Sequence, residues 1–305
     1  MLYKYCDFSK KTKDGKVVCF SLKNLAEGSF YLRSIWGMND PFENKLLLEV
    51  PEVNSFRELK NYRRDALGLI DRLINLRRVN EQDYSKLRSF RKEVNRCGLE
   101  NYKDVFAKFE NHAITGIGFL SRGINITCFS ERHDIPMMWS HYADGMRGFC
   151  VGYKRADTRN SIKVKYVESP NKISMLEALP FSELHVRRLQ ENVIKYKSID
   201  WAYEREHRVY SLGHKLPFDA SEIKCVFVGF KASVEDVEAL RLALREGGLS
   251  PEIYLCLLED WSYKVSTKRL SFSEIIGFLK YQKERLAQEN VTIEEKRSEI
   301  LNRRG

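Results

Sequence analysis

Two glutamates stand two positions apart in the segment WAYEREHRVY, residues 201–210. In an extended strand, Glu204 and Glu206 point to the same face, and Arg208 continues that alternation. Like charges this close raise each other's pKa unless a cation lies between them. Such an acidic pair can bind a metal ion or a sugar hydroxyl, or polarise a nucleophile. The alternative without a function is a ladder of ion pairs on the protein surface.

A second candidate is the segment PMMWSHYADGMRGFCVGY, residues 136–153. Trp139, His141 and Tyr142 stand within four positions, between a proline and two glycines that allow a tight turn into the next strand. The aromatic rings can form one wall of a cleft, although core packing is the commoner use of such residues. His141 has no second histidine at H-E-x-x-H or H-x-H spacing, so no histidine metal site is predicted.

Polar residues also lie where other predicted strands begin or end, in the segments YKY (3–5), MNDPFE (38–43) and CFSERHD (128–134). Loops at strand ends carry functional groups on a rigid scaffold. We therefore expect these segments and the two candidates above to line one pocket. The candidate binding residues are Lys4, Tyr5, Asn39, Asp40, Ser130, Trp139, Tyr142 and Arg208, and the candidate catalytic residues are Glu206, Glu204 and His141.

The elements that must position these residues indicate an α+β fold with a mixed sheet. Strands are predicted at 2–5, 30–32, 125–130, 148–153, 162–167, 206–212, 224–230 and 252–258. The last two flank a predicted helix at 233–246, and such a strand–helix–strand unit is typical of parallel pairing.

Apolar residues at three- and four-residue spacing predict helices between about 55 and 113. We treat this segment as an insertion in a single α+β domain, residues 1–270, which a helical tail at 271–305 follows. Another helix is expected at about 182–198. Residues 57–96 contain twelve Lys or Arg against six Asp or Glu, an excess that favours polyanionic partners such as nucleic acid. A solvated helical face is the alternative.

Composition limits the class of protein. The chain has 305 residues, 43% of them hydrophobic, and a formal net charge of +10, which indicates a folded protein. No secretory signal or apolar run of about 18 residues is visible. The seven cysteines never show C-x-x-C spacing, so we predict reduced thiols in a cytoplasmic protein. The motifs of P-loop NTPases, Rossmann oxidoreductases, α/β hydrolases and kinases are missing.

Six landmarks follow one another along the chain: LYKY, NDPFE, CFSE, MMWSHYADGMRGFCVGY, EREHR and VFVGF. In their identity and order they resemble a widespread bacterial family of unknown function, domain-of-unknown-function family 2971. The resemblance covers residues 1–50 and 115–270 and leaves out the helical insertion and the tail. It supplies no reaction.

A more distant resemblance does imply a reaction. A strand with a polar tip, a short helix, a glycine, a strand, the segment CFSERHDIPMMW and a strand with E-x-E are similar to ADP-ribosyltransferases of the DNA-targeting toxin type. This resemblance implies a sheet core of that kind, and an enzyme that cleaves NAD and modifies a nucleic-acid or protein acceptor. A toxin or a phage-defence effector would have such an activity.

The same resemblance implies roles for the glutamates. Cleavage of the nicotinamide–ribose bond passes through an oxocarbenium-like state, as other glycosidic cleavages do. Glu206 would bond the ribose 2′-hydroxyl and stabilise the developing positive charge, and Glu204 would orient the acceptor.

It also implies the groups that bind NAD. An aromatic face of Tyr5, Trp139 or Tyr142 would stack on the nicotinamide. Lys4 or Arg208 would hold the pyrophosphate. At the first strand, these transferases usually have a His or Arg, whereas Lys4 here stands between two tyrosines.

Two other functions stay open from the sequence. One is a metal-dependent nuclease, in which acidic residues gather Mg²⁺ beside a basic groove. Those residues would be Asp40, Glu43, Glu204 and Glu206. The strand continues Glu-His-Arg-Val, without a lysine at the usual offset beyond the acidic pair. The other is a non-catalytic sensor of nucleic acid or of a ligand, in which the cleft is only a binding pocket.

Overall fold

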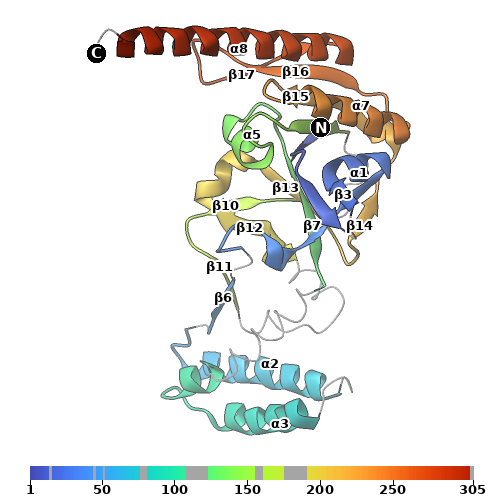
Figure 1. Ribbon diagram of the computed structural model, residues 1–305. Helices are drawn as coiled ribbons and strands as arrows, with labels where there is room; N and C mark the ends of the chain where they lie inside the picture. The colour runs from blue at the N-terminus through green and yellow to red at the C-terminus, as the bar shows by residue number, and fades with distance from the viewer. Residues whose placement is uncertain are drawn as a thin grey trace.

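A computed structural model of the chain describes residues 1–13, 16–43, 46–50, 52–75, 81–107, 123–154, 161–174 and 191–302. Within these residues, nine strands form one mixed sheet at the centre of the molecule (Figure 1). They are β1 (Leu2–Cys6), β5 (Arg33–Ser34), β7 (Asn125–Ser130), β8 (Phe149–Tyr153), β9 (Ser161–Lys163), β13 (Glu206–Ser211), β15 (Ile223–Gly229), β16 (Glu252–Leu258) and β17 (Val265–Arg269). Their order is β17-β16-β15-β8-β1-β7-β13-β9, and β5 also pairs with β7.

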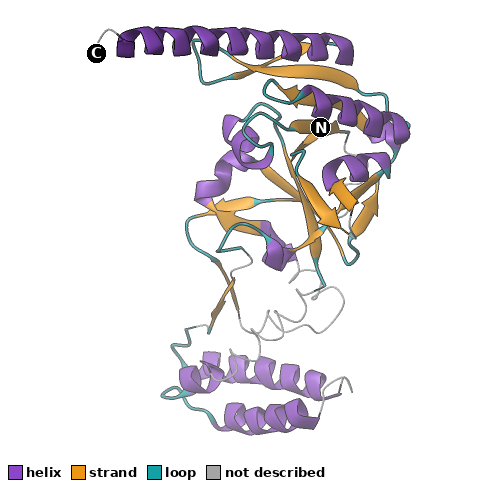
Figure 2. Cartoon of the chain, viewed as in Figure 1, coloured by secondary structure: helices purple, strands orange, loops and turns teal. Residues whose placement is uncertain are grey.

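Short paired strands and helices lie outside this sheet, as Figure 2 shows. The pairs are β2 (Lys10–Lys13) with β3 (Lys16–Cys19), β4 (Ser29–Tyr31) with β14 (Lys215–Pro217), β6 (Leu46–Glu49) with β11 (Asn171–Ser174), and β10 (Lys165–Val167) with β12 (Tyr196–Ser198). The helices are α1 (Phe20–Ala26), α2 (Phe56–Asn75), α3 (Glu81–Arg96), α5 (Pro136–Tyr142), α7 (Val234–Glu246) and α8 (Phe272–Asn302), with 3₁₀ helices η1 (Ile35–Gly37), η2 (Ile199–Glu204) and η3 (Ala220–Glu222).

The strand–helix–strand unit near the C-terminus is confirmed. β15 and β16 are parallel neighbours, and α7 connects them. The Oγ of Ser233 accepts a hydrogen bond from the backbone N–H of Asp236, which caps the start of α7. Val237, Leu240 and Leu244 recur at three- and four-residue spacing and are buried. The spacing therefore predicted both the helix and the face that packs on the sheet.

The tight turn between α5 and β8 is also confirmed. Asp144, Gly145 and Met146 all have left-handed backbones, with φ of 47°, 59° and 72°. A Cβ at Gly148 would lie 2.2 Å from the carbonyl oxygen of Cys6, so only glycine fits there. This turn holds α5 against the sheet.

The two faces of the sheet carry different cores. Leu2 of β1 packs with side chains of α1, α7 and α8, and we call this side the α7 face. Tyr3 and Tyr5 of the same strand pack with Met138 and Trp139 of α5 and with Tyr203 of η2, and we call that side the α5 face. Because neighbouring residues of a strand point to opposite sides, residue parity along β1 decides which face each side chain joins.

Helices α2 and α3 lie at the end of the molecule opposite α8 (Figure 1). They share a core of their own, to which Leu59 and Ile70 of α2 and Val94 of α3 contribute, all fully buried. Arg91 of α3 also donates to Asp71 of α2, with Nε and Oδ1 2.6 Å apart. Residues 102–107 are helical as well, while 76–80 and 108–113 of the expected insertion lie outside the described residues.

The prediction of a helix at 182–198 is wrong for its last three residues. Residues 191–195 are helical, but Tyr196–Ser198 form strand β12, parallel to β10. Residues 182–190 lie outside the described ones. The helical spacing of apolar residues continues through this segment, and pairing with β10 overrides it.

Two further findings concern the described part of the chain as a whole. All seven cysteines, each of them in the described part of the chain, are free, as the sequence predicted. No helix within the described residues combines the length and the apolar character needed to cross a membrane.

Candidate functional site

Glu206 and Arg208 lie two residues apart on β13 and point to the same side, as the alternation predicts. The Nε of Arg208 donates to Oε1 of Glu206 at 2.9 Å, and a terminal nitrogen donates to Oε2 at 3.1 Å. Glu206 is 3% exposed and Arg208 is fully buried. The alternative of a surface ion-pair ladder is therefore wrong, because these charges lie inside the protein.

Glu204 lies at the end of η2 and not on the strand, which corrects the expected geometry. Arg205, between the two glutamates, has a left-handed backbone with φ 45° and ψ 51°. This conformation is unfavourable for a residue with a Cβ. It redirects the chain, so that both carboxylates meet one cation: the Nζ of Lys197 lies 2.5 Å from Oε2 of Glu204 and 3.3 Å from Oε2 of Glu206. The two glutamates converge, but a backbone turn brings them together.

Glu43 completes this group from the segment after η1. Its two carboxylate oxygens accept from the two terminal nitrogens of Arg208, at 2.7 and 3.0 Å. Arg208 also donates to the carbonyl oxygen of Ile194 at 2.9 Å. We call Glu43, Lys197, Glu204, Glu206 and Arg208 the buried ion cluster.

A set of polar and aromatic side chains connects the cluster to the surface. The hydroxyl of Tyr142 donates to Oε1 of Glu204 at 2.5 Å and accepts from Nδ2 of Asn39 at 3.0 Å. Next to it, Nδ1 of His141 and the hydroxyl of Tyr203 are hydrogen-bonded at 3.0 Å. Asn39 and His141 are exposed, and the two tyrosines are half-buried. We call these four residues the rim.

The two central glutamates differ in their electrostatics. Burial works against the charge of Glu206, but the charges of Arg208 and Lys197 outweigh it and lower the pKa of Glu206 to about 2. Burial raises the pKa of Glu204 above its ordinary value, against the attraction of Lys197. Glu206 therefore stays ionised, and Glu204 is the first of the two to take up a proton as the pH falls.

The lowered pKa of Glu206 makes stability depend on acid pH. A group whose pKa is lowered by folding contributes stability above its unfolded-state pKa, here 4.5, and loses it as the pH falls toward about 2. We expect the free energy of unfolding of the wild type to decrease more between about pH 5 and about pH 3 than that of Glu206→Gln. Urea unfolding at both pH values measures this. Equal decreases in the two proteins would contradict the assigned charge state.

Some candidate residues belong to the core instead of the rim. Trp139 is fully buried, and its Nε1 donates to the carbonyl oxygen of His133 at 2.7 Å. Tyr5 packs edge-on against Trp139, with ring centroids 5.5 Å apart, and donates to the carbonyl oxygen of Arg132. Neither ring offers a free face to a ligand, so the stacking role expected for them is wrong.

The other candidates lie around the cluster or away from it. Lys4 points to the α7 face, where its Nζ donates to Oγ1 of Thr127 at 2.7 Å, so the sheet separates it from the cluster. Ser130 is buried opposite Glu206 in the strand register. Asp40 is 4% exposed, and its Oδ2 is buried without a hydrogen-bond partner among the described residues.

Lys197 and Tyr203 were missed from the sequence. Lys197 falls in the helix expected at 182–198, where no role was predicted for it. The alternating segment Ile-Lys-Tyr-Lys-Ser at 194–198 was the available signal for a strand with one buried lysine. Tyr203 carries no motif of its own, and only the packing of η2 beside α5 brings it to His141.

Comparison with known proteins adds one finding to this geometry. No curated protein and no solved structure matches the chain, so the resemblance to ADP-ribosyltransferases is not confirmed. Within the described residues, no three or more His, Cys, Asp or Glu side chains are grouped to hold a metal ion. Residues 138–209, which contain every member of the cluster and rim except Asn39 and Glu43, match the model of the family described as "Protein of unknown function (DUF2971)".

Proposed function

We propose that the protein is an ADP-ribosyltransferase-like enzyme that cleaves NAD, with the buried ion cluster and the rim as its active site. The observation that carries this proposal is the charge balance of the cluster. Three carboxylates against two cations leave one negative charge beneath a rim with two tyrosines. The nicotinamide ring of NAD is positively charged, and a negative site with aromatic faces is complementary to it.

Glu204 is the carboxylate that reaches the rim, through the hydroxyl of Tyr142. Its raised pKa suits a group that accepts or donates a proton. Glu204 and Glu206 are both 3% exposed, but the two oxygens of Glu206 face Arg208 and Lys197. In this arrangement Glu206 therefore acts through its fixed charge and not by contact with the ribose. Such a preorganised charge stabilises positive charge that develops as the nicotinamide–ribose bond breaks.

The groups that bind the rest of NAD differ from those expected. Tyr142 and Tyr203 provide the aromatic surface in place of Tyr5 and Trp139. Of the two cations expected at the pyrophosphate, Lys4 lies on the opposite face of the sheet and Arg208 is fully paired.

Arg205 is the better candidate for the pyrophosphate. Its side chain is exposed and forms no ion pair with the described residues. It stands between the two glutamates, at the edge of the cluster. We assign it the contact with the pyrophosphate, which a guanidinium group binds well.

The nuclease alternative has less support. Glu43 and Glu206 both face Arg208. Glu204 faces Lys197. In these three residues, the oxygen lone pairs that would coordinate Mg²⁺ are thus turned toward cations of the protein. Asp40, the fourth expected ligand, keeps its Oδ2 without a hydrogen-bond partner among the described residues.

Thermal unfolding in the presence of NAD tests the proposal. A ligand at 100 times its Kd stabilises the folded state by about 2.7 kcal/mol, which raises the midpoint of unfolding by several degrees. We expect this shift for the wild type and a smaller one for Arg205→Gln. Arg269→Gln, which changes an exposed arginine on β17, should keep the full shift. Protection by Mg²⁺ with an oligonucleotide and not by NAD would favour the nuclease, and binding of nucleic acid without a product would favour the sensor.

The acceptor is proposed to be nucleic acid, bound by α2 and α3. Exposed cations follow one face of each helix at three- or four-residue spacing: Arg57, Lys60 and Arg64 on α2, and Arg88, Lys92 and Arg96 on α3. Arg64 pairs with Asp65. Four of the six, Arg57, Lys60, Lys92 and Arg96, form no ion pair with the described residues. Unpaired cations on helix faces bind phosphates with release of counterions.

The salt dependence of binding to duplex DNA measures this contribution. Each phosphate contact adds about −0.9 to the slope of log K against log salt concentration. Replacing the four unpaired cations with glutamine should therefore make the slope less negative by up to about 3.6 units. The control replaces Lys224, Lys231, Lys280 and Arg269, four exposed cations of the sheet domain and α8. Anisotropy of a labelled duplex gives both slopes. An equal change of slope in the two variants would contradict a binding surface on α2 and α3.

A further inference from the structure

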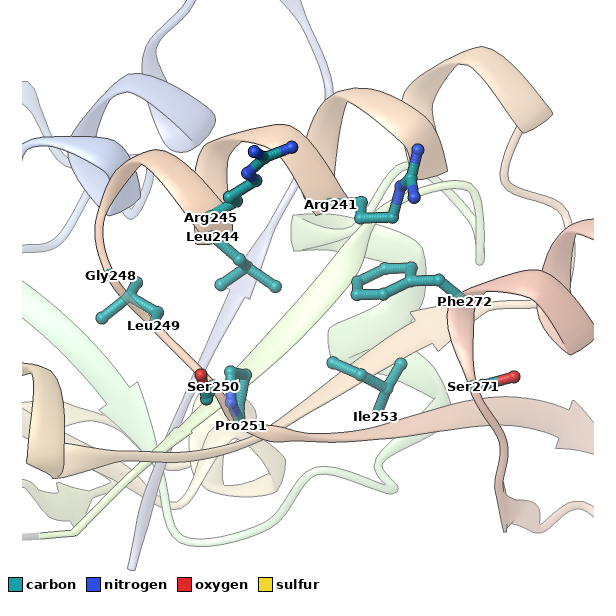
Figure 3. A pocket seen from close by; sticks show the side chains of 10 residues that line it. All are labelled: Arg241, Leu244, Arg245, Gly248, Leu249, Ser250, Pro251, Ile253, Ser271 and Phe272. Atoms are coloured by element: carbon teal, nitrogen blue, oxygen red, sulfur yellow. The ribbon is translucent and has the colours of Figure 1, made fainter.

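A hollow of about 550 Å³ lies between the end of α7, the start of β16 and the start of α8 (Figure 3). It is on the α7 face, so the sheet separates it from the proposed active site. Its volume is within the range of small-molecule sites, roughly 300–1,000 Å³. The chain therefore has space for a second ligand, independent of the proposed function.

The floor of the hollow is apolar. Leu244 and Leu249 are 3% and 7% exposed and belong to the main core. Ile253 and Phe272 are half-buried and pack against that core from β16 and α8. Figure 3 shows the Phe272 ring between α7 and the strand below it. A ligand with an apolar body would cover side chains that are now partly in water, which favours binding.

The turn after α7 leaves this space open. Gly248 has a left-handed backbone with φ +64°, and a Cβ there would meet nothing within 4 Å. The N–H of Leu249 donates to the carbonyl oxygen of Leu244 at 2.8 Å, which folds the chain back beneath the end of the helix.

Two arginines of α7 stand at the edge of the hollow, one helical turn apart. Arg241 is held by Glu238, with Nε 2.8 Å from Oε2. Arg245 forms no ion pair with the described residues, and the exposed hydroxyl of Ser250 has no hydrogen-bond partner among them. Arg245 and Ser250 are therefore free to bind a polar group of a ligand.

The charges around the hollow favour an anion. The carbonyl end of α7 counts as about half a negative charge, which is less than the full positive charge of Arg245. Glu238 is neutralised by Arg241. Glu274 is used to cap α8, where it accepts from the backbone N–H and the hydroxyl of Ser271, both at 2.7 Å.

We infer that this hollow binds an organic anion with an apolar body, whose single carboxylate or phosphate pairs with Arg245 while its body lies on the floor of Leu244, Leu249 and Phe272. A cation of the same shape would meet Arg245 with like charge. An inorganic anion would lack the apolar contacts. Both differences can be measured.

Calorimetric titration of the full chain with octanoate, octyl phosphate, octyltrimethylammonium and inorganic phosphate tests the inference. The two octyl anions should bind at least about tenfold more tightly than the octyl cation, and inorganic phosphate more weakly than octyl phosphate. Arg245→Gln should weaken the binding of both octyl anions by about tenfold. Ser250→Trp, which places a large ring in the hollow, should weaken them as well, while Lys280→Gln on the exposed side of α8 should not.

Several results would overturn the inference. One is equal binding of the octyl anions and the octyl cation, because charge would then play no part. Another is that Arg245→Gln and Ser250→Trp both bind the octyl anions as tightly as the wild type does, because the ligand would then lie elsewhere. A third is binding of inorganic phosphate as tight as that of octyl phosphate. Circular dichroism of the two variants shows whether each keeps its fold, and either folded variant suffices for the test.

Discussion

Replacing Arg208 with methionine is expected to lower the free energy of unfolding by about 3–5 kcal/mol, the range measured when one partner of a buried ion pair is removed. Methionine keeps much of the length of the side chain but no charge. Glu43 would then lose the cation that both its oxygens face, and Glu206 would keep only Lys197. Urea unfolding at neutral pH measures the loss.

Arg132→Met is the matched control for this prediction. Arg132 also makes two hydrogen bonds to one carboxylate, that of Asp134, at 2.6 and 2.7 Å. Its side chain is 47% exposed, and exposed pairs contribute about 0–1 kcal/mol. Equal losses for the two variants would show that burial of the cluster does not govern stability, which contradicts the arrangement described here.

Glu204→Gln is expected to slow nicotinamide release from NAD by about 100- to 10,000-fold, the usual contribution of a positioned general acid or base. The affinity for NAD should also fall, but by a smaller factor, because the cluster loses the negative charge that is complementary to the nicotinamide ring in the ground state. Stability should change little. Folding raises the pKa of Glu204, so the folded protein already disfavours its charge, and the neutral amide keeps the size of the side chain.

Two other glutamates provide controls for this variant. Glu206→Gln should slow the reaction and also destabilise the fold, because Arg208 and Lys197 would then face two carboxylates, Glu43 and Glu204, instead of three. Glu131→Gln should leave the rate unchanged, because its carboxylate pairs with Lys163 and with His207, which points to the other side of β13 from Glu206. A normal rate for folded Glu204→Gln would contradict the role given to Glu204.

Much of the sheet could be predicted from the sequence, because periodicity reports local burial directly. β1, β7, β8, β13, β15 and β16 all fall within or next to expected strands, and the unit β15–α7–β16 has its expected parallel pairing. The end of the helix expected at 182–198 could not be predicted. Its strand exists because β10 is available as a neighbour, and such a long-range contact leaves only a weak trace in local spacing.

The candidate site was also predicted only in part, because local spacing and residue type indicate some of its residues and not others. Alternation correctly put Glu206 and Arg208 on one side of β13, and residue types pointed to Tyr142, His141 and Asn39. Burial of Trp139 could not be distinguished from exposure by its type, since a large aromatic ring serves a core and a ligand equally well. The positive φ of Arg205 has no sequence signal, because glycine is the residue that such a backbone favours.

The central claim, that the buried ion cluster and its rim form a site that cleaves NAD, is tested most directly by nicotinamide release from wild-type protein. The assay supplies NAD alone and NAD with DNA, RNA or cell lysate as the acceptor, and compares the wild type with Glu204→Gln and Glu131→Gln. We predict release by the wild type and by Glu131→Gln, with a much lower rate for Glu204→Gln. Folded wild-type protein that neither binds NAD nor releases nicotinamide with any of these acceptors would contradict the claim.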